Sequence, residues 1–193
     1  MDSFRKTIFD FVTQSQERFQ TAYEIAQSWE EIRFELIRTF QKEVASQTKE
    51  RLADQSDASE IKVETNEKGW AIWIYKTSWE HEEDVWICPK VERMNGEDYW
   101  GIWRYADRVK PQVKQVQNEY WKQKGLRQKR GDDVWWFFYE YTGNDFRNID
   151  PLIQLLKEET RKPLVDRYSK TLAGYFMEYE SHIDFLIDAM RKE

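Results

Sequence analysis

The sequence predicts an α+β fold, in which a Trp-rich antiparallel sheet of about five strands is packed by helices. Three observations predict it. Residues 3–52 contain no Pro or Gly and repeat apolar residues at three- and four-residue steps, which is typical of a helix. Residues 61–141 include runs in which side chains alternate at period two and Trp and Tyr are frequent. Helical spacing returns from residue 148 onward.

The N-terminal segment is expected to be coiled-coil-like. A heptad seam, imperfect at Ser15 and Arg18, runs through Ile8, Phe11, Ala22, Ile25, Trp29, Ile32 and Leu36. A single helix over 3–52 would be about 75 Å long. We therefore expect either a long arm or two helices, broken near residues 14–20 or 45–47. The polar residues 53–59 are the expected linker, which divides the chain into an N-terminal helical segment, 1–58, and an α+β domain with C-terminal helices, 59–193.

The sheet is predicted from five strands, at residues 61–65, 70–76, 85–92, 99–105 and 134–141. The second of these is apolar on both faces, which indicates a central strand. Pro89 has no N–H to donate, so the third strand is expected at an edge or at a bulge. Asn95-Gly96 predicts a two-residue hairpin. A helix is expected over 107–123, before the last strand.

Two helices are predicted after residue 148. Asp150-Pro151 has the pattern of an N-cap followed by the first helical residue. Pro163 predicts the start of a second helix, over about 162–191. The apolar stripe of this second helix is again close to a heptad and comprises Val165, Tyr168, Leu172, Tyr175, Tyr179, His182, Leu186 and Ala189. The two terminal stripes could pack on each other or on a second copy of the chain.

The tryptophans are the first candidates for a binding surface. Aromatic residues make up 16% of the 193-residue chain, and a small sheet cannot easily bury all of them. Exposed aromatic side chains anchor protein partners or stack on bases. The residues expected to contact a protein partner are Trp79, Trp86, Trp100, Trp103, Trp135 and Trp136. Burial beneath the flanking helices is the alternative for most of them.

The charge distribution suggests a second kind of partner. The formal net charge of −6 argues against indiscriminate coating of nucleic acid. Residues 106–131 nevertheless carry 8 Lys and Arg against 2 Asp and Glu. The residues that would contact nucleic acid are Lys122, Lys124, Arg127, Lys129 and Arg130. A solvated helix end and loop is the alternative.

No set of residues in the sequence fixes a reaction. A metal-dependent nuclease would hold carboxylates and a Lys on neighbouring strands, and Glu60-Ile61-Lys62 supplies only one half of that pattern. The acidic run 80–84 includes His81, but side chains of sequence neighbours point apart. His182 lies on an apolar stripe, and Cys88 is interpreted as a small buried hydrophobe. We therefore expect no catalytic residue, metal or cofactor.

The sequence also predicts where the protein works. No apolar run approaches the length of a membrane span, and residues 1–6 lack the apolar core of a signal peptide. The single cysteine excludes an internal disulfide, in keeping with a reducing compartment. We expect a cytoplasmic protein without a membrane partner.

Several motifs of the sheet region resemble a known family. Their order is similar to the region downstream of the catalytic core in bacterial PD-(D/E)xK nuclease superfamily proteins, with a later Trp-rich segment like residues 134–139. The motifs are Gly69-Trp70-Ala71-Ile72, Lys76-Thr77-Ser78-Trp79, Val85-Trp86-Ile87 and Tyr99-Trp100-Gly101-Ile102. The Asp and Glu-x-Lys pair of the nuclease core has no counterpart ahead of this region, so the resemblance carries over no catalytic residue. It implies an accessory part with a recognition or assembly role, in a bacterial or phage defence setting.

The favoured function is thus a non-catalytic interaction module that binds a protein partner, which could be a second copy of the chain. Nucleic-acid binding through the basic loop at 122–130 is the first alternative. A metal-dependent nuclease using Glu60 and Lys62 is the second.

Overall fold

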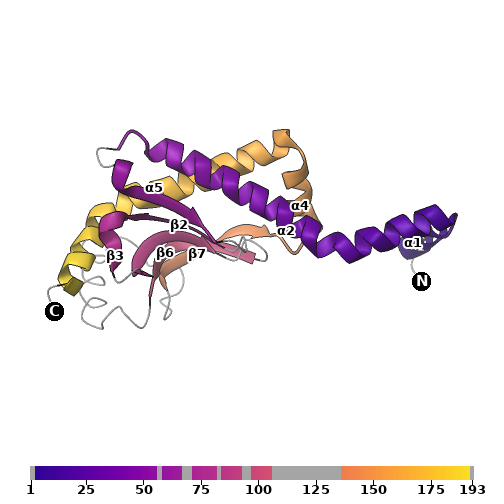
Figure 1. Ribbon diagram of the computed structural model, residues 1–193, viewed down its shortest axis with the longest axis horizontal. Coiled ribbons are helices and arrows are strands. Elements are labelled where there is room, and N and C mark those ends of the chain that lie inside the picture. Colours follow the sequence, from indigo (N-terminus) through magenta and orange to yellow (C-terminus); the bar gives the residue numbers. More distant parts are fainter. Residues whose placement is uncertain are drawn as a thin grey trace.

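The structure is a computed structural model with two layers, in which helices cover one face of an antiparallel sheet (Figure 1). This arrangement confirms the predicted α+β fold, with a long N-terminal helix and two C-terminal helices. The residues that the structure describes are 3–55, 58–66, 71–81, 84–92, 97–105 and 136–191. The predicted helix at 107–123, the basic loop, the Asn95-Gly96 hairpin and residues 134–135 lie outside them.

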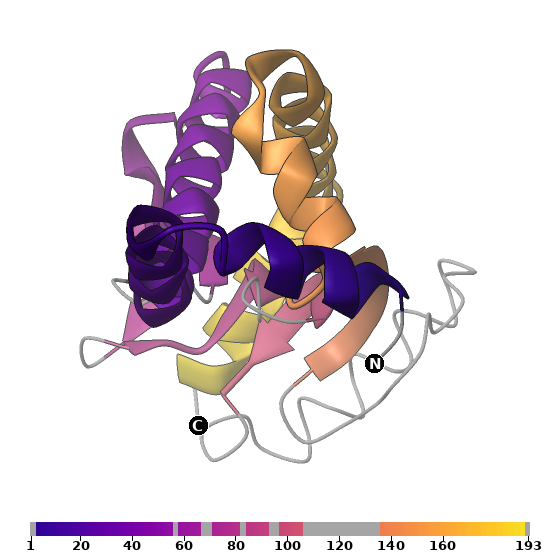
Figure 2. The ribbon, with the colours of Figure 1, turned by 90° about the vertical axis from the view of Figure 1, so that its right-hand side faces the viewer.

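The N-terminal segment forms two helices, α1 (Ser3–Val12) and α2 (Gln16–Leu52). The break, at residues 13–15, overlaps the first of the two predicted positions, 14–20, and α2 continues through residues 45–47. Ser15 begins α2 because its hydroxyl accepts the backbone N–H of Arg18 at 3.2 Å, as an N-cap residue does. Figure 2 shows that α1 lies across the end of α2 and does not continue its direction.

The main sheet has five strands in the order β1-β2-β5-β6-β7, and every neighbouring pair is antiparallel. The strands are β1 (Ile61–Thr65), β2 (Ala71–Lys76), β5 (Ile87–Glu92), β6 (Glu97–Arg104) and β7 (Trp136–Asp145). β2 lies between β1 and β5, which confirms the central strand predicted from its two apolar faces. Between β2 and β5 the chain forms a two-stranded pair, β3 (Glu80–His81) with β4 (Asp84–Val85).

The prediction that Pro89 marks an edge or bulged strand is wrong. β5 lies between β2 and β6, and Pro89 is paired with Ile102 of β6. The pairing of β5 with β2 covers Glu92, Val91 and Lys90 and does not include Pro89, the next residue toward the N-terminus. The ladder on that side therefore ends where the chain can no longer donate an N–H, and a proline is tolerated inside the sheet.

The C-terminal helices are α4 (Ile149–Leu156) and α5 (Glu158–Arg191). Both begin earlier than predicted: the N-cap is Asn148 and not Asp150, and Pro163 lies inside α5. The junction satisfies its own backbone, because the Thr160 hydroxyl donates to the carbonyl of Gln154 at 2.8 Å. Arg161 then ties the junction to α2, since its Nε donates to Glu43 at 2.9 Å.

The core lies between the sheet and these helices. In α2 the buried side chains begin at Ile37, so the C-terminal part of the predicted segment 1–58 shares one core with 59–193. The buried residues on the helix-facing side of the sheet include Ile72, Ile74, Ile87, Val91 and Ile102. Within the described ranges, no helix combines the length and apolar character needed to cross a bilayer.

An ion-pair cluster joins β2 to α5 beside this core. The Lys76 ammonium lies 2.5 Å from Glu180 and 3.1 Å from Asp184. The indole N–H of Trp79 donates to the other oxygen of Asp184 at 2.6 Å. The step from strand to 3-10 turn at 76–79 is therefore fixed to the last helix by charged hydrogen bonds.

Candidate functional site

Three of the candidate tryptophans are buried in the structure. Trp79 is 1% exposed and packs on Phe176, with ring centroids 5.5 Å apart. Trp100 meets Tyr168 edge to face at 5.2 Å, and Trp136 is also buried. These side chains are part of the internal packing and offer no exposed surface in the chain.

The remaining tryptophans differ in burial and in the face of the sheet on which they lie, and Trp103 of β6 is paired with Trp136 of β7. Trp86 and Trp103 are partly buried. Trp103 is three residues from Trp100 on β6, so the two side chains point to opposite faces of the sheet. Trp135 lies outside the described residues, as do all five candidates for nucleic-acid contact, Lys122, Lys124, Arg127, Lys129 and Arg130.

The two halves of the nuclease pattern have separate environments. Glu60 is exposed at the end of a 3-10 turn, whereas Lys62 pairs with Glu80 at 3.0 Å. Among the residues that the structure describes, no group of three or more His, Cys, Asp and Glu could hold a metal ion. Burial raises the pKa of the Cys88 thiol to about 12, so it is not a thiolate at neutral pH.

A hollow of about 280 Å³ lies on the sheet face opposite the helices. Its walls include Trp73, Tyr75 and Trp103, and Glu64 and Glu80 lie at its edge. Burial raises the pKa of Tyr75, and hydrogen bonds from its hydroxyl to the two glutamates raise it further. The hydrogen bond from Lys62 lowers the pKa of Glu80. Among the described residues, Tyr75 and Lys62 therefore form polar contacts with the glutamates at the edge of this hollow.

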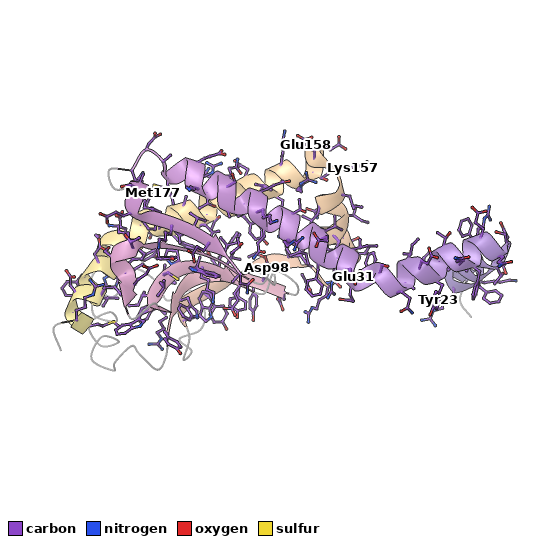
Figure 3. The ribbon with its side chains drawn as sticks, in the orientation of Figure 1. Tyr23, Glu31, Asp98, Lys157, Glu158 and Met177 are labelled. Carbon is purple, nitrogen blue, oxygen red and sulfur yellow. The ribbon has the colours of Figure 1, made fainter. Side chains whose placement is uncertain are left out.

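A buried carboxyl group was not foreseen from the sequence. Asp98 on β6 accepts from Thr142 at 2.5 Å and from the Tyr168 hydroxyl, which also accepts from Asn144 at 2.8 Å. The register of β6 and β7 shifts beside Asp98, and Gly143 has a φ of +83°, so a bulge brings Thr142 and Asn144 to the carboxylate. Burial raises the pKa of Asp98 to about 7. Figure 3 shows it on the sheet beneath α2, where the cluster links β6, β7 and α5.

The most exposed apolar surface lies at the other end of the molecule. We call residues 3–36, which are α1 and the first part of α2, the arm. The arm projects beyond the sheet, and in Figure 3 Tyr23 lies far from the body while Glu31 lies close to it. Its exposed large apolar residues are Phe4, Ile8, Phe9, Phe11, Phe19, Tyr23, Ile25, Trp29, Ile32 and Phe34.

One face of the arm carries the α2 part of the predicted heptad seam. We call Ala22, Ile25, Trp29, Ile32 and Leu36 the arm stripe. Ile25 is 52% exposed, Trp29 is 38% exposed and Ile32 is 41% exposed. The α2 part of the seam therefore lies on one face of a single helix, and the described part of the chain leaves these three side chains substantially exposed.

A groove at the base of the arm continues the stripe. It has a volume of about 440 Å³ and lies where Ile32 and Leu36 of α2 approach Leu155 of α4. Glu31 and Glu35 line it as well. The neighbouring helix α4 exposes further apolar side chains, which are Ile149, Ile153 and Leu156.

The stripe, the groove and α4 together form the strongest candidate for a functional surface. The spacing of apolar residues indicated the stripe, but the groove depends on how α4 packs beside α2, which no pattern in the sequence indicates. The resemblance to the accessory region of PD-(D/E)xK nucleases stays a prediction. Comparisons with protein-family models, with curated proteins and with solved structures find no match for this chain.

Proposed function

We propose that the chain is a non-catalytic module that binds a protein partner through its N-terminal arm. The observation that carries the proposal is the exposed apolar surface of the arm. An isolated helix is marginally stable in water, and most helical stability comes from packing an apolar face. A large apolar patch on an exposed surface marks an interaction site. The arm has such a face without a covering layer among the described residues.

The geometry suits a helical partner. A helix that lies along the arm stripe would continue into the groove beside Leu155, which is the helix-in-groove mode of recognition. Trp29 is the largest side chain of the stripe and is the expected energetic centre, because tryptophans dominate binding hot spots. Glu31 and Glu35 would form part of the polar rim.

The test uses a substitution on the stripe and a matched one off it. Ile25→Asp with Trp29→Asp places charges on the stripe. The control is Tyr23→Asp, because Tyr23 is 60% exposed, compared with 52% for Ile25, and lies about 160° around the helix from it. A partner is captured with the full chain, identified, purified and titrated by calorimetry. We expect the stripe variant to weaken binding at least about 100-fold, and Tyr23→Asp to leave it within about threefold. Equal affinities of the two variants would count against the proposal.

The same proteins decide between this proposal and its rivals. Nucleic acid that binds the stripe variant as well as the natural chain, with an affinity that falls steeply with salt, would favour the basic loop at 122–130. Cleavage of DNA or RNA with Mg²⁺ that is lost in Glu60→Ala would favour the nuclease.

A further inference from the structure

We infer that the arm binds a second copy of this chain, with the two arms antiparallel about a two-fold axis and each reaching the groove at the base of the other. The inference rests on the proposed function and names its partner. Two-fold pairing of identical surfaces is the commonest form of assembly in soluble proteins. Within the part of the chain that the structure describes, both halves of such a contact are present: a helix with an exposed apolar stripe and a groove at its base.

The residues of the stripe complement one another in the antiparallel direction. The seam alternates between two heptad positions, and in an antiparallel pair each kind lies opposite the other kind on the second helix. This places Ala22 opposite Ile32 of the partner subunit and Ile25 opposite its Trp29. Each layer then joins a smaller side chain to a larger one, as close packing requires. The axis passes near residue 27, close to the middle of the part of α2 that extends from the body.

The same register carries the tip of each arm to the other body. It places Arg18 opposite Leu36, which lines the groove. Residues 3–12, which precede this point, then come toward the exposed apolar side of α4, with its Ile153 and Leu156. One symmetric arrangement therefore covers the stripe, the groove and the tip at once.

The charges select the antiparallel direction. Glu31 and Glu35 line the groove at the base of the arm, where Arg33 pairs with Glu30, whereas Arg18 lies toward the tip, next to Glu17. Antiparallel pairing brings Arg18 beside the partner's Glu35. Parallel pairing would place Arg18 beside its own copy and the acidic residues beside theirs, which is repulsive.

The available surface is large enough for a stable dimer. Phe19, Tyr23 and Phe34 lie off the arm stripe, and the other four aromatic side chains of the arm are between 38% and 72% exposed. At about 150–250 Å² for a full aromatic side chain, these four offer roughly 450 Å². A standard interface buries about 800 Å² on each partner, so they supply more than half of it before the stripe isoleucines and α4 are added.

The first experiment measures the oligomeric state by sedimentation equilibrium, using a charge swap. We expect the natural chain to dimerise in the micromolar range. Arg18→Glu and Glu35→Arg should each weaken the dimer about 10-fold, and the two together in one chain should restore it to within about threefold. The off-stripe control Tyr23→Asp should not change it. A chain that stays monomeric at about 100 µM, or a double variant weaker than both single variants, would overturn the inference.

The second experiment tests the register by cross-linking. Ala22→Cys and Ile32→Cys chains should form a disulfide under mild oxidation only when they are mixed. The native Cys88 is buried and does not compete. A disulfide formed by Ala22→Cys alone would mean parallel arms and would overturn the inference.

These outcomes are separable from those of the proposed function. A monomeric chain whose purified partner depends on Ile25 and Trp29 would overturn the second-copy inference and leave the protein-binding role intact. A monomeric chain that partitions onto anionic vesicles through the arm would overturn both.

Discussion

Asp98→Asn is expected to abolish a pH dependence that Asp98 gives to the natural chain. Between pH 4 and pH 8, ionisation of Asp98 should lower the free energy of unfolding of the natural chain by about 4 kcal/mol, and the variant should not show this decrease. Burial raises the pKa of this carboxyl group to about 7, although the hydrogen bonds from Thr142 and Tyr168 oppose the rise. In the unfolded chain the group has its ordinary pKa near 4. The folded state therefore holds the proton more tightly, and its advantage is present at low pH and lost as the pH passes through 7.

The measurement is urea unfolding of both proteins at a series of pH values. The free energy of unfolding of Asp98→Asn minus that of the natural chain should rise by about 4 kcal/mol between pH 4 and pH 8. An amide cannot lose a proton in this range, so it keeps the neutral form that the buried cluster prefers. A difference between the two proteins that stays constant with pH would contradict the pKa of Asp98.

His182 is expected to act in the opposite direction and must be included in the comparison. Burial lowers the pKa of this imidazole to about 4. Its neutral form is favoured in the folded state, so its contribution is present above pH 6.5 and is lost as the pH falls toward 4. The two slopes overlap, which makes the profile of the natural chain flatter than that of Asp98→Asn. This is why the difference between variants, and not the profile of one protein, reports on Asp98.

Replacing Phe40 with Ala is expected to cost about 3–5 kcal/mol, because it leaves a cavity in a core that cannot fully collapse. Phe40 is fully buried, with its ring 5.7 Å from Phe146 and 5.2 Å from Tyr168. Tyr168 also holds Asp98, so the cavity would loosen the buried polar cluster as well.

The matched control is Phe19→Ala on the same helix. Phe19 is 58% exposed and lies off the arm stripe, so its loss should change the free energy of unfolding by less than about 0.5 kcal/mol. Urea unfolding of both variants measures the contrast. Equal costs would mean that the arm contributes to the core of its own chain, which would contradict the division of α2 at Ile37.

The sequence was informative wherever one period governs a segment. Alternation of Ile72 and Ile74 with Trp73 and Tyr75 predicted a central strand, because both faces needed apolar neighbours. Prediction from the sequence failed where the hydrogen-bonded pairing of strands decides the structure. Pro89 is tolerated inside the sheet only because the pairing of β5 with β2 stops at Lys90, and residue type alone does not show where a ladder ends.

The features of the candidate site also fall into those that residue spacing predicts and those that it does not. Heptad spacing located the stripe through Ile25, Trp29 and Ile32, because a helix turns its seam to one face regardless of what covers it. The tryptophan surface stays a prediction, and the structure buries Trp79, Trp100 and Trp136 among its candidate residues. Burial depends on packing between segments that are distant in the chain. Trp100 points to the helices and Trp103 away from them. Neither the groove nor the cluster around Asp98 follows from spacing, because each joins residues that are distant in the chain.

Hydrogen–deuterium exchange of the arm amides is the most direct test of the claim that the arm is covered by a protein. An uncovered helix opens readily, so its amides exchange fast unless a partner buries it. We expect the amides of residues 19–36 to be protected at least about 10-fold more strongly at high protein concentration, or with the purified partner, than in the dilute chain, while residues 37–52 stay protected throughout. Fast exchange over 19–36 under all of these conditions would contradict the account.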